Sequence, residues 1–182
     1  GVIHWKLRQY DSAIAYETRV LSLASVDSVT LLEDSSEVMR VLGKCYWEQG
    51  DTVPAIVMMR RALRAATTDS RPDHFSIAMI MCNLGAQLLE AEELEEADSL
   101  AAAVIASCSV IEYPSSAICI RAVVLRAEIS QKRGNCREAI RLGTEALSKC
   151  QEWAPGYSES KAQCLGLLAS FEFECGSQEI AL

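Results

Sequence analysis

Three basic residues, Arg40, Lys44 and Arg121, are positioned where they could hold an anionic partner. Each falls on the side of an expected helix that helical periodicity leaves to solvent. Guanidinium and ammonium groups bind carboxylates and phosphates, so this set predicts a basic patch that attracts acidic or phosphorylated segments. Glu37 and Glu128 lie near these residues in the sequence, and Arg40 could equally pair with Glu37 along its helix. The residue types leave both interpretations open.

Two tryptophans, Trp5 and Trp47, form a second group that could bind a partner. The step from one to the other, repeated along the chain, leads on to Leu89, Gln131 and Phe173. Tryptophan is a frequent anchor at protein interfaces. The series therefore predicts either an apolar ladder along a binding groove or packing between neighbouring helices, and the sequence does not separate the two.

Catalytic motifs are missing from the sequence. It has no glycine-rich phosphate loop, no H-E-x-x-H and no G-x-S-x-G. With two histidines and no C-x-x-C pair, a Cys/His metal site has little to draw on. We therefore expect no enzyme activity, no cofactor and no metal.

The eight cysteines are interpreted as small buried hydrophobic residues in a reducing compartment. Cys108 and Cys150 are separated by the same step as the two tryptophans, so they occupy equivalent positions in neighbouring units. This interpretation favours a cytoplasmic location, including structures such as the cytoskeleton or the cilium.

Charge and hydropathy narrow the class of partner. The formal net charge of −8 repels phosphate backbones, so we expect no nucleic acid. The longest nearly apolar stretch, residues 100–111, is shorter than the ~20 residues that cross a bilayer, so we expect no membrane insertion. A protein or peptide partner remains.

The most regular feature of the chain is a 42-residue period, which includes the two spacings above. Alanine keeps this step at Ala13, Ala55, Ala97, Ala139 and Ala181. Small residues keep it at Gly1, Gly43, Gly85, Ala127 and Ala169. A fixed period of this length is typical of stacked supersecondary units that bury their apolar faces against their neighbours.

Each period resolves into two helices. In the second unit the apolar spacing predicts helices over 35–49 and 53–66, separated by Gly50-Asp51. The small residues Gly43 and Ala55 predict a close approach of the two helix axes. The acidic run 92–98 falls at the start of a later helix, where carboxylates interact favourably with the helix dipole. The expected fold is an all-α solenoid of antiparallel helix hairpins.

The domain organisation follows from this period. We expect a single array over 1–182 that is an excerpt of a longer one. It would comprise a partial repeat over 1–33, repeats over about 34–75, 76–117 and 118–159, and a partial repeat over 160–182.

The pattern L-G-x-x-Y-x-x-x-G-D-x-x-x-A-I over residues 42–56, followed by Ala62-Leu63, resembles the tetratricopeptide repeat (TPR). The usual repeat has about 34 residues, and the longer unit here resembles the kinesin light chain type. Three segments carry that resemblance: Cys82-Asn83-Leu84-Gly85, Arg61-Ala62-Leu63 and Asp73-His74-Phe75, with Phe75 where that family has proline.

The resemblance implies a right-handed superhelix in which the first helix of each hairpin lines a concave groove for peptides. It also implies that Asn83 hydrogen-bonds the backbone of a bound peptide, for which its amide offers donors and an acceptor. The expected groove residues are Trp5, Arg40, Lys44, Trp47, Asn83 and Arg121.

We therefore expect a non-enzymatic scaffold or adaptor that binds partner peptides in the groove. Two alternatives stay open. One is a rigid arm of a larger assembly that uses its convex or end surfaces. The other is a ligand-sensing regulatory array attached to an effector domain.

Overall fold

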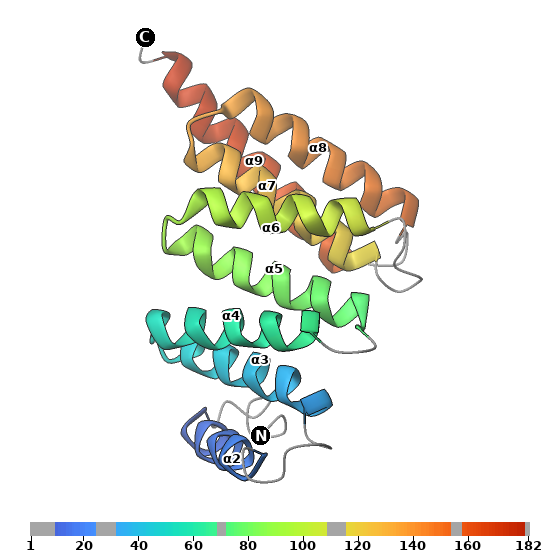
Figure 1. Cartoon of the computed structure of the whole chain (residues 1–182). Coiled ribbons are helices and arrows are strands. Elements are labelled where there is room, and N and C mark those ends of the chain that lie inside the picture. The colour runs from blue at the N-terminus through green and yellow to red at the C-terminus, as the bar shows by residue number, and fades with distance from the viewer. Residues whose placement is uncertain (1–9, 25–31, 69–71, 109–115, 154–157, 181–182) are drawn as a thin grey trace. The chain divides into compact units, whose positions relative to one another are not determined.

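The computed structural model describes residues 10–24, 32–68, 72–108, 116–153 and 158–180. Within these ranges the chain forms helices and no strand, as Figure 1 shows. The eight helices of these ranges are α2 (Tyr10–Ala24), α3 (Leu32–Glu48), α4 (Thr52–Thr68), α5 (His74–Glu90), α6 (Leu94–Ser107), α7 (Ser116–Lys132), α8 (Cys136–Trp153) and α9 (Ser158–Ile180). The all-α hairpin fold expected from the sequence is confirmed.

The helix starts fall into two series, and both keep the 42-residue step. The odd-numbered helices begin at Leu32, His74, Ser116 and Ser158. The even-numbered helices begin at Tyr10, Thr52, Leu94 and Cys136. The odd-numbered helices are therefore the expected first helices of the hairpins, and the even-numbered ones are the second.

The chain divides into two compact units, residues 1–92 (unit 1) and 93–182 (unit 2), and each is described by itself. The boundary lies at the turn after α5, inside the repeat expected over 76–117. One continuous array over 1–182 stays a prediction, and so does the handedness of a superhelix.

The turns after α3 and α7 are closed by the same two backbone hydrogen bonds. After α3, the N–H of Gly50 donates to Trp47 O at 2.9 Å and that of Asp51 donates to Tyr46 O at 2.9 Å. After α7, Gly134 and Asn135 make the corresponding bonds, each at 2.8 Å. Both glycines are left-handed, with φ of 85° and 74°, as this way of ending a helix requires.

Glu92 occupies the corresponding place after α5 and has a φ of 62°. A side chain in the left-handed region costs about 1–2 kcal/mol, whereas glycine avoids that cost but loses about 0.5–1 kcal/mol more chain entropy on folding. We therefore expect Glu92→Gly to raise the free energy of unfolding by up to about 1 kcal/mol, measured by urea denaturation followed by circular dichroism.

The neighbouring residue provides the matched control for this prediction. Glu93 has a φ of −82°, so Glu93→Gly gains nothing from glycine and should lower the denaturation midpoint. A Glu92→Gly variant that is no more stable than Glu93→Gly would contradict the assigned turn.

Among the described residues, the small residues of the period are buried, except for Ala169, which is exposed on α9. Ala13, Ala55, Ala97 and Ala139 are all fully buried, while Ala181 lies outside the described residues. A Cβ atom on Gly43 would lie 2.9 Å from Met59 Cγ and 3.1 Å from the carbonyl oxygen of Ala55. The predicted close approach of α3 and α4 is thus confirmed.

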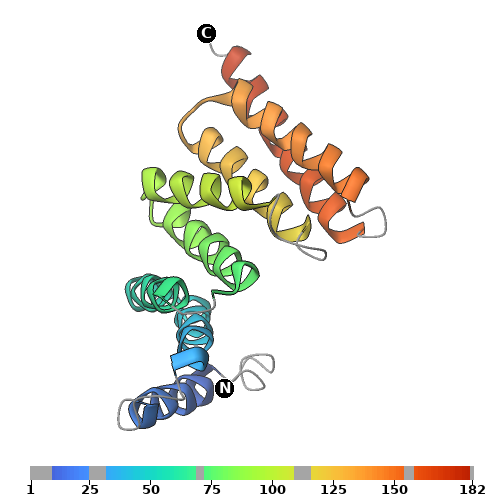
Figure 2. The same ribbon diagram turned by 45° about the vertical axis from the view of Figure 1, so that its right-hand side comes forward.

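Unit 2 has its own core, in which Phe171 of α9 packs with Val123 of α7 and Leu142 of α8. Figures 1 and 2 both show α8, in orange, running beside α9, in red. The described helices of this unit therefore bury a shared apolar core.

Ion pairs join α6 to α7 in the same unit. Asp98 accepts a hydrogen bond from Arg126 Nε at 2.8 Å and another from Arg133 Nη1 at 2.9 Å. Burial acts to raise the pKa of Asp98, but the two arginines outweigh it and hold the pKa below its usual value. Glu95 and Glu96 lie in the first turn of α6, as the helix-dipole interpretation expects, and Glu95 also pairs with Arg133 at 3.5 Å.

Two disulfides, Cys108–Cys119 and Cys136–Cys175, correct the expectation that all cysteines are thiols. Their Cα atoms are 6.0 and 5.7 Å apart, within the range that a disulfide spans. The sequence separations of 11 and 39 residues give no hint of these pairings, because the fold brings the cysteines together. The remaining four, Cys45, Cys82, Cys150 and Cys164, are buried thiols as expected.

Candidate functional site

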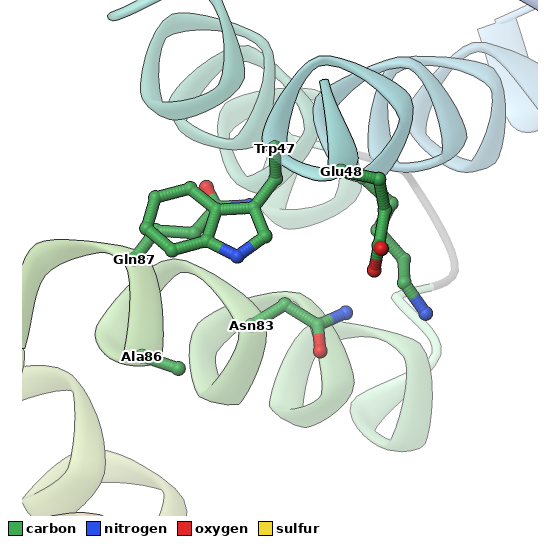
Figure 3. Close-up of a pocket in the computed structure, with 6 residues that line it drawn as sticks. Trp47, Glu48, Asn83, Ala86 and Gln87 are labelled. Carbon is green, nitrogen blue, oxygen red and sulfur yellow. The ribbon is translucent and has the colours of Figure 1, made fainter. Parts of the chain in front are cut away.

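A hollow of about 110 Å³ lies between α3 and α5 in unit 1 (Figure 3). Its lining is Lys44, Trp47 and Glu48 from α3 with Asn83, Ala86 and Gln87 from α5. Each helix contributes residues at spacing i, i+3 and i+4, which places them on one helical face. The volume suits several water molecules or one side chain of a partner, and is below the ~300–1,000 Å³ of pockets that enclose whole small ligands.

Contacts at the helix ends hold this lining in place. The end of α3 is tied to α2, because Tyr10 donates to Glu48 Oε2 at 3.4 Å and Gln49 donates to Asp11 Oδ1 at 2.6 Å. At the start of α5, Asp73 accepts the N–H groups of Phe75 and Ser76 at 3.1 and 3.2 Å. The hydroxyl of Ser76 and these backbone bonds lower the pKa of Asp73, so it caps α5 as a carboxylate.

The hollow combines an aromatic wall with polar groups of both signs. Figure 3 shows Trp47 and Glu48 reaching from α3 toward α5, where Asn83 and Gln87 lie. Trp47 and Asn83 are half-buried, while Glu48 is exposed. The formal charges of Lys44 and Glu48 cancel, so the lining as a whole selects for neither sign of charge. An apolar group with hydrogen-bonding atoms beside it fits this arrangement best.

Gln87 is a member of the hollow that the sequence argument did not single out. It is 4% exposed, and its Oε1 has no hydrogen-bond partner among the described residues. The period offers a signal that would have found it. At the same place in the other repeats lie Cys45, Ile129 and Phe171, all buried and apolar. A lone amide in an otherwise apolar series marks an unusual position.

We expect Gln87→Leu to raise the free energy of unfolding by about 1 kcal/mol. A buried acceptor without a partner costs about 1–3 kcal/mol, and leucine removes it while keeping a similar volume. Thermal and urea denaturation of the full chain measure the change.

Gln131→Leu is the matched control, because the half-buried amide of Gln131 donates to Glu174. That variant loses a hydrogen bond and should gain no stability. A Gln87→Leu variant less stable than the parent would show that the amide has a partner in solution.

The structure brings three of the six predicted groove residues together, Lys44, Trp47 and Asn83, around the one hollow. Arg40 follows the alternative left open by the sequence, because its Nε donates to Glu37 Oε2 at 2.6 Å and its Nη2 pairs with the other oxygen. Arg121 is exposed on α7 in unit 2, and Trp5 lies outside the described residues. That a partner binds any of these residues stays a prediction.

No group of three or more His, Cys, Asp or Glu side chains in the described ranges could hold a metal ion. Burial, followed by the nearby Glu17, raises the pKa of Cys45 to about 11, which makes this thiol a poor nucleophile at neutral pH. None of the described helices combines the length and apolar character needed to span a bilayer.

Solved structures match this chain, although no family model and no curated protein does. The crystal structure of BtubC (BKLC) from P. vanneervenii is similar with a TM-score of 0.69 and 19% identity over 92% of this chain. The match spans 65% of the BtubC chain. The crystal structure of MamA is similar with a TM-score of 0.59 and 18% identity, covering 98% of this chain and 95% of that one. Both are TPR-like helical proteins, and the likeness shows the same type of fold here.

Proposed function

We propose that this chain is a non-enzymatic scaffold that binds a segment of a partner protein in the hollow between α3 and α5. The observation that carries the proposal is the convergence of Trp47 and Asn83, from two helices, on a space of about 110 Å³. The TPR-like fold supports the general role, because such arrays present extended surfaces to protein partners.

Four of the six lining residues would have distinct parts in binding. Trp47 supplies a large apolar wall against which a side chain of the partner packs. Asn83 supplies an amide that can donate to and accept from a peptide backbone. Lys44 attracts an acidic or phosphorylated residue of the partner next to the apolar one. Glu48 repels such a residue where it would lie close to the Glu48 carboxylate.

The disulfides of unit 2 bear on the compartment in which the protein binds its partner. The cytoplasmic location expected from the sequence stays a prediction, and the two disulfides of unit 2 weigh against it. Disulfides persist in oxidising compartments and are rare where thiols are kept reduced.

Selection from a random peptide library tests the proposal without the natural partner. The library is displayed on phage, selected on the full chain and counter-selected on the Trp47→Ala variant. The proposal expects a shared motif with an apolar residue, whose peptides bind the parent chain and not the variant. Enriched peptides that bind both proteins equally well would place the binding surface elsewhere.

A second use of the fold is favoured by one observation. Val53 and Val57 lie one turn apart on α4 and are 73% and 45% exposed. A rigid arm that docks through its second helices would use such a face. Loss of binding in a Val53→Ser, Val57→Ser double variant, with binding retained in Trp47→Ala, would favour this alternative.

A further inference from the structure

Cys150 and Cys164 form a close pair of buried thiols in unit 2. Cys150 lies near the end of α8 and Cys164 lies in the second turn of α9. Their Sγ atoms are 3.5 Å apart, and the two residues are only 2% and 1% exposed. They belong to the same core as Ala146 and Phe171. A disulfide bond needs the two sulfurs about 1.5 Å closer, at ~2 Å.

The 42-residue period relates this pair to a disulfide that the structure contains. Cys150 is the equivalent of Cys108, one period earlier. Cys108 directly follows α6 and is bonded to Cys119 in the first turn of α7. Cys150 at the end of α8 lies against Cys164 of α9 in the same way. Cys164 is about one helical turn further into α9 than Cys119 is into α7. Both pairs join the end of a second helix to the beginning of the next first helix.

The second disulfide of unit 2 joins the same two helices as this pair of thiols. Cys136–Cys175 joins the first residue of α8 to the C-terminal half of α9. Cys150 and Cys164 lie at the opposite ends of those two helices. A bond between them would fasten the contact between α8 and α9 at both ends.

We propose that Cys150 and Cys164 are a site of oxidative modification that closes to a third disulfide when a low-molecular-weight disulfide such as oxidised glutathione is present. One cysteine, as thiolate, attacks a sulfur of the oxidant, forms a mixed disulfide and releases one glutathione thiolate. The second cysteine, as thiolate, then attacks the protein sulfur of the mixed disulfide and releases the second glutathione. The two protein thiols lose two protons and two electrons, and the oxidant gains the electrons as two thiols.

The pair is slow to react for a physical reason. Burial, together with the neighbouring Cys150, raises the pKa of Cys164, so little of its thiolate is present at neutral pH. Both sulfurs are also buried, so the oxidant reaches them only when the contact between α8 and α9 opens locally, and closure needs prolonged exposure to it. Once formed, the bond links two cysteines 14 residues apart and restricts the unfolded chain, so the melting temperature should rise by several degrees.

The test counts thiols in the full chain, purified without reductant. The protein is unfolded in N-ethylmaleimide, and the adducts are counted by intact-mass spectrometry. Before oxidation we expect four adducts, on Cys45, Cys82, Cys150 and Cys164. After prolonged incubation of the folded protein with oxidised glutathione we expect two, with a Cys150–Cys164 link in the tryptic fragments and a higher melting temperature.

Two variants separate the proposal from unspecific oxidation. Cys45→Ser should fall from three adducts to one, because Cys45 takes no part. Cys150→Ser should form no new disulfide and show no rise in melting temperature. The count in the parent chain decides the matter even where a variant folds poorly. Four adducts retained after oxidation, a mixed disulfide with glutathione that does not close, or a new link that involves Cys45 or Cys82 would each overturn the proposal.

Discussion

Replacing Gly43 with leucine is expected to destabilise unit 1 by about 3 kcal/mol, the upper end of the range for overpacked helix contacts. Even a single Cβ atom at Gly43 would lie 3.1 Å from the backbone oxygen of Ala55. A backbone atom cannot move aside as the end of a side chain can, so α3 and α4 would have to separate. Urea denaturation of the full chain, followed by circular dichroism and tryptophan fluorescence, measures the loss.

The same substitution at Gly166 serves as the control for the Gly43 variant. Gly166 is an exposed residue within α9, and a Cβ atom there would meet nothing within 4 Å. Gly166→Leu should be neutral or stabilising by up to about 1 kcal/mol, because leucine favours the helix more than glycine does. Equal losses from the two substitutions would contradict the close packing of α3 on α4.

Replacing Trp47 with alanine is expected to weaken the binding of a library-selected peptide by at least ~30-fold. Aromatic anchors at the centre of an interface commonly contribute about 2 kcal/mol or more, which corresponds to that factor. Trp47 is the largest side chain in the hollow and the only aromatic one among its lining residues. Isothermal titration calorimetry gives the affinity, and circular dichroism checks that the helices remain.

Phe173 provides a control that the period itself defines. It occupies the place of Trp47 three periods later, on α9 in unit 2, and is 79% exposed. Phe173→Ala removes a comparable apolar ring and should leave the affinity unchanged within about twofold. Trp47→Phe keeps an aromatic wall and should lose less affinity than Trp47→Ala. Equal losses from Trp47→Ala and Phe173→Ala would show that binding does not depend on the hollow.

The fold could be predicted from the sequence because the 42-residue period marks recurring positions at which the size of the side chain is restricted. A residue at which two helix backbones approach closely must stay small, as Gly43 and Ala55 do, and this requirement returns wherever the same contact returns. Helix starts such as Thr52 and Leu94 then follow at the same step. A residue that differs from its equivalents in the other repeats is harder to interpret from the sequence. Glu92 adopts a glycine conformation without being glycine, because its turn keeps the hydrogen bond to Leu89.

The candidate site could be predicted only in part. Helical periodicity singled out Lys44, the 42-residue step singled out Trp47 without separating groove from helix packing, and the resemblance singled out Asn83. The sequence left open whether Arg40 binds a partner or pairs with Glu37, because that depends on side-chain geometry, and the structure shows the pair with Glu37. Gln87 was missed because polar residues on a helix are ordinarily assigned to solvent, whereas the structure buries this one to 4% exposure.

The cysteines show a further limit of the sequence argument. Composition alone does not say which cysteines meet in space, and the pairs Cys108–Cys119 and Cys136–Cys175 form only through the packing of unit 2. The equivalence of Cys108 and Cys150 was visible in the period. Its consequence, a second meeting of helix ends at Cys150 and Cys164, required the structure.

Amide chemical-shift mapping of the full chain with a library-selected peptide shows whether the peptide binds in the hollow between α3 and α5. We expect the largest shifts on the lining of the hollow, at Lys44, Trp47, Glu48, Asn83, Ala86 and Gln87. Shifts centred on Val53 and Val57 of α4, or on the helices of unit 2, would contradict it.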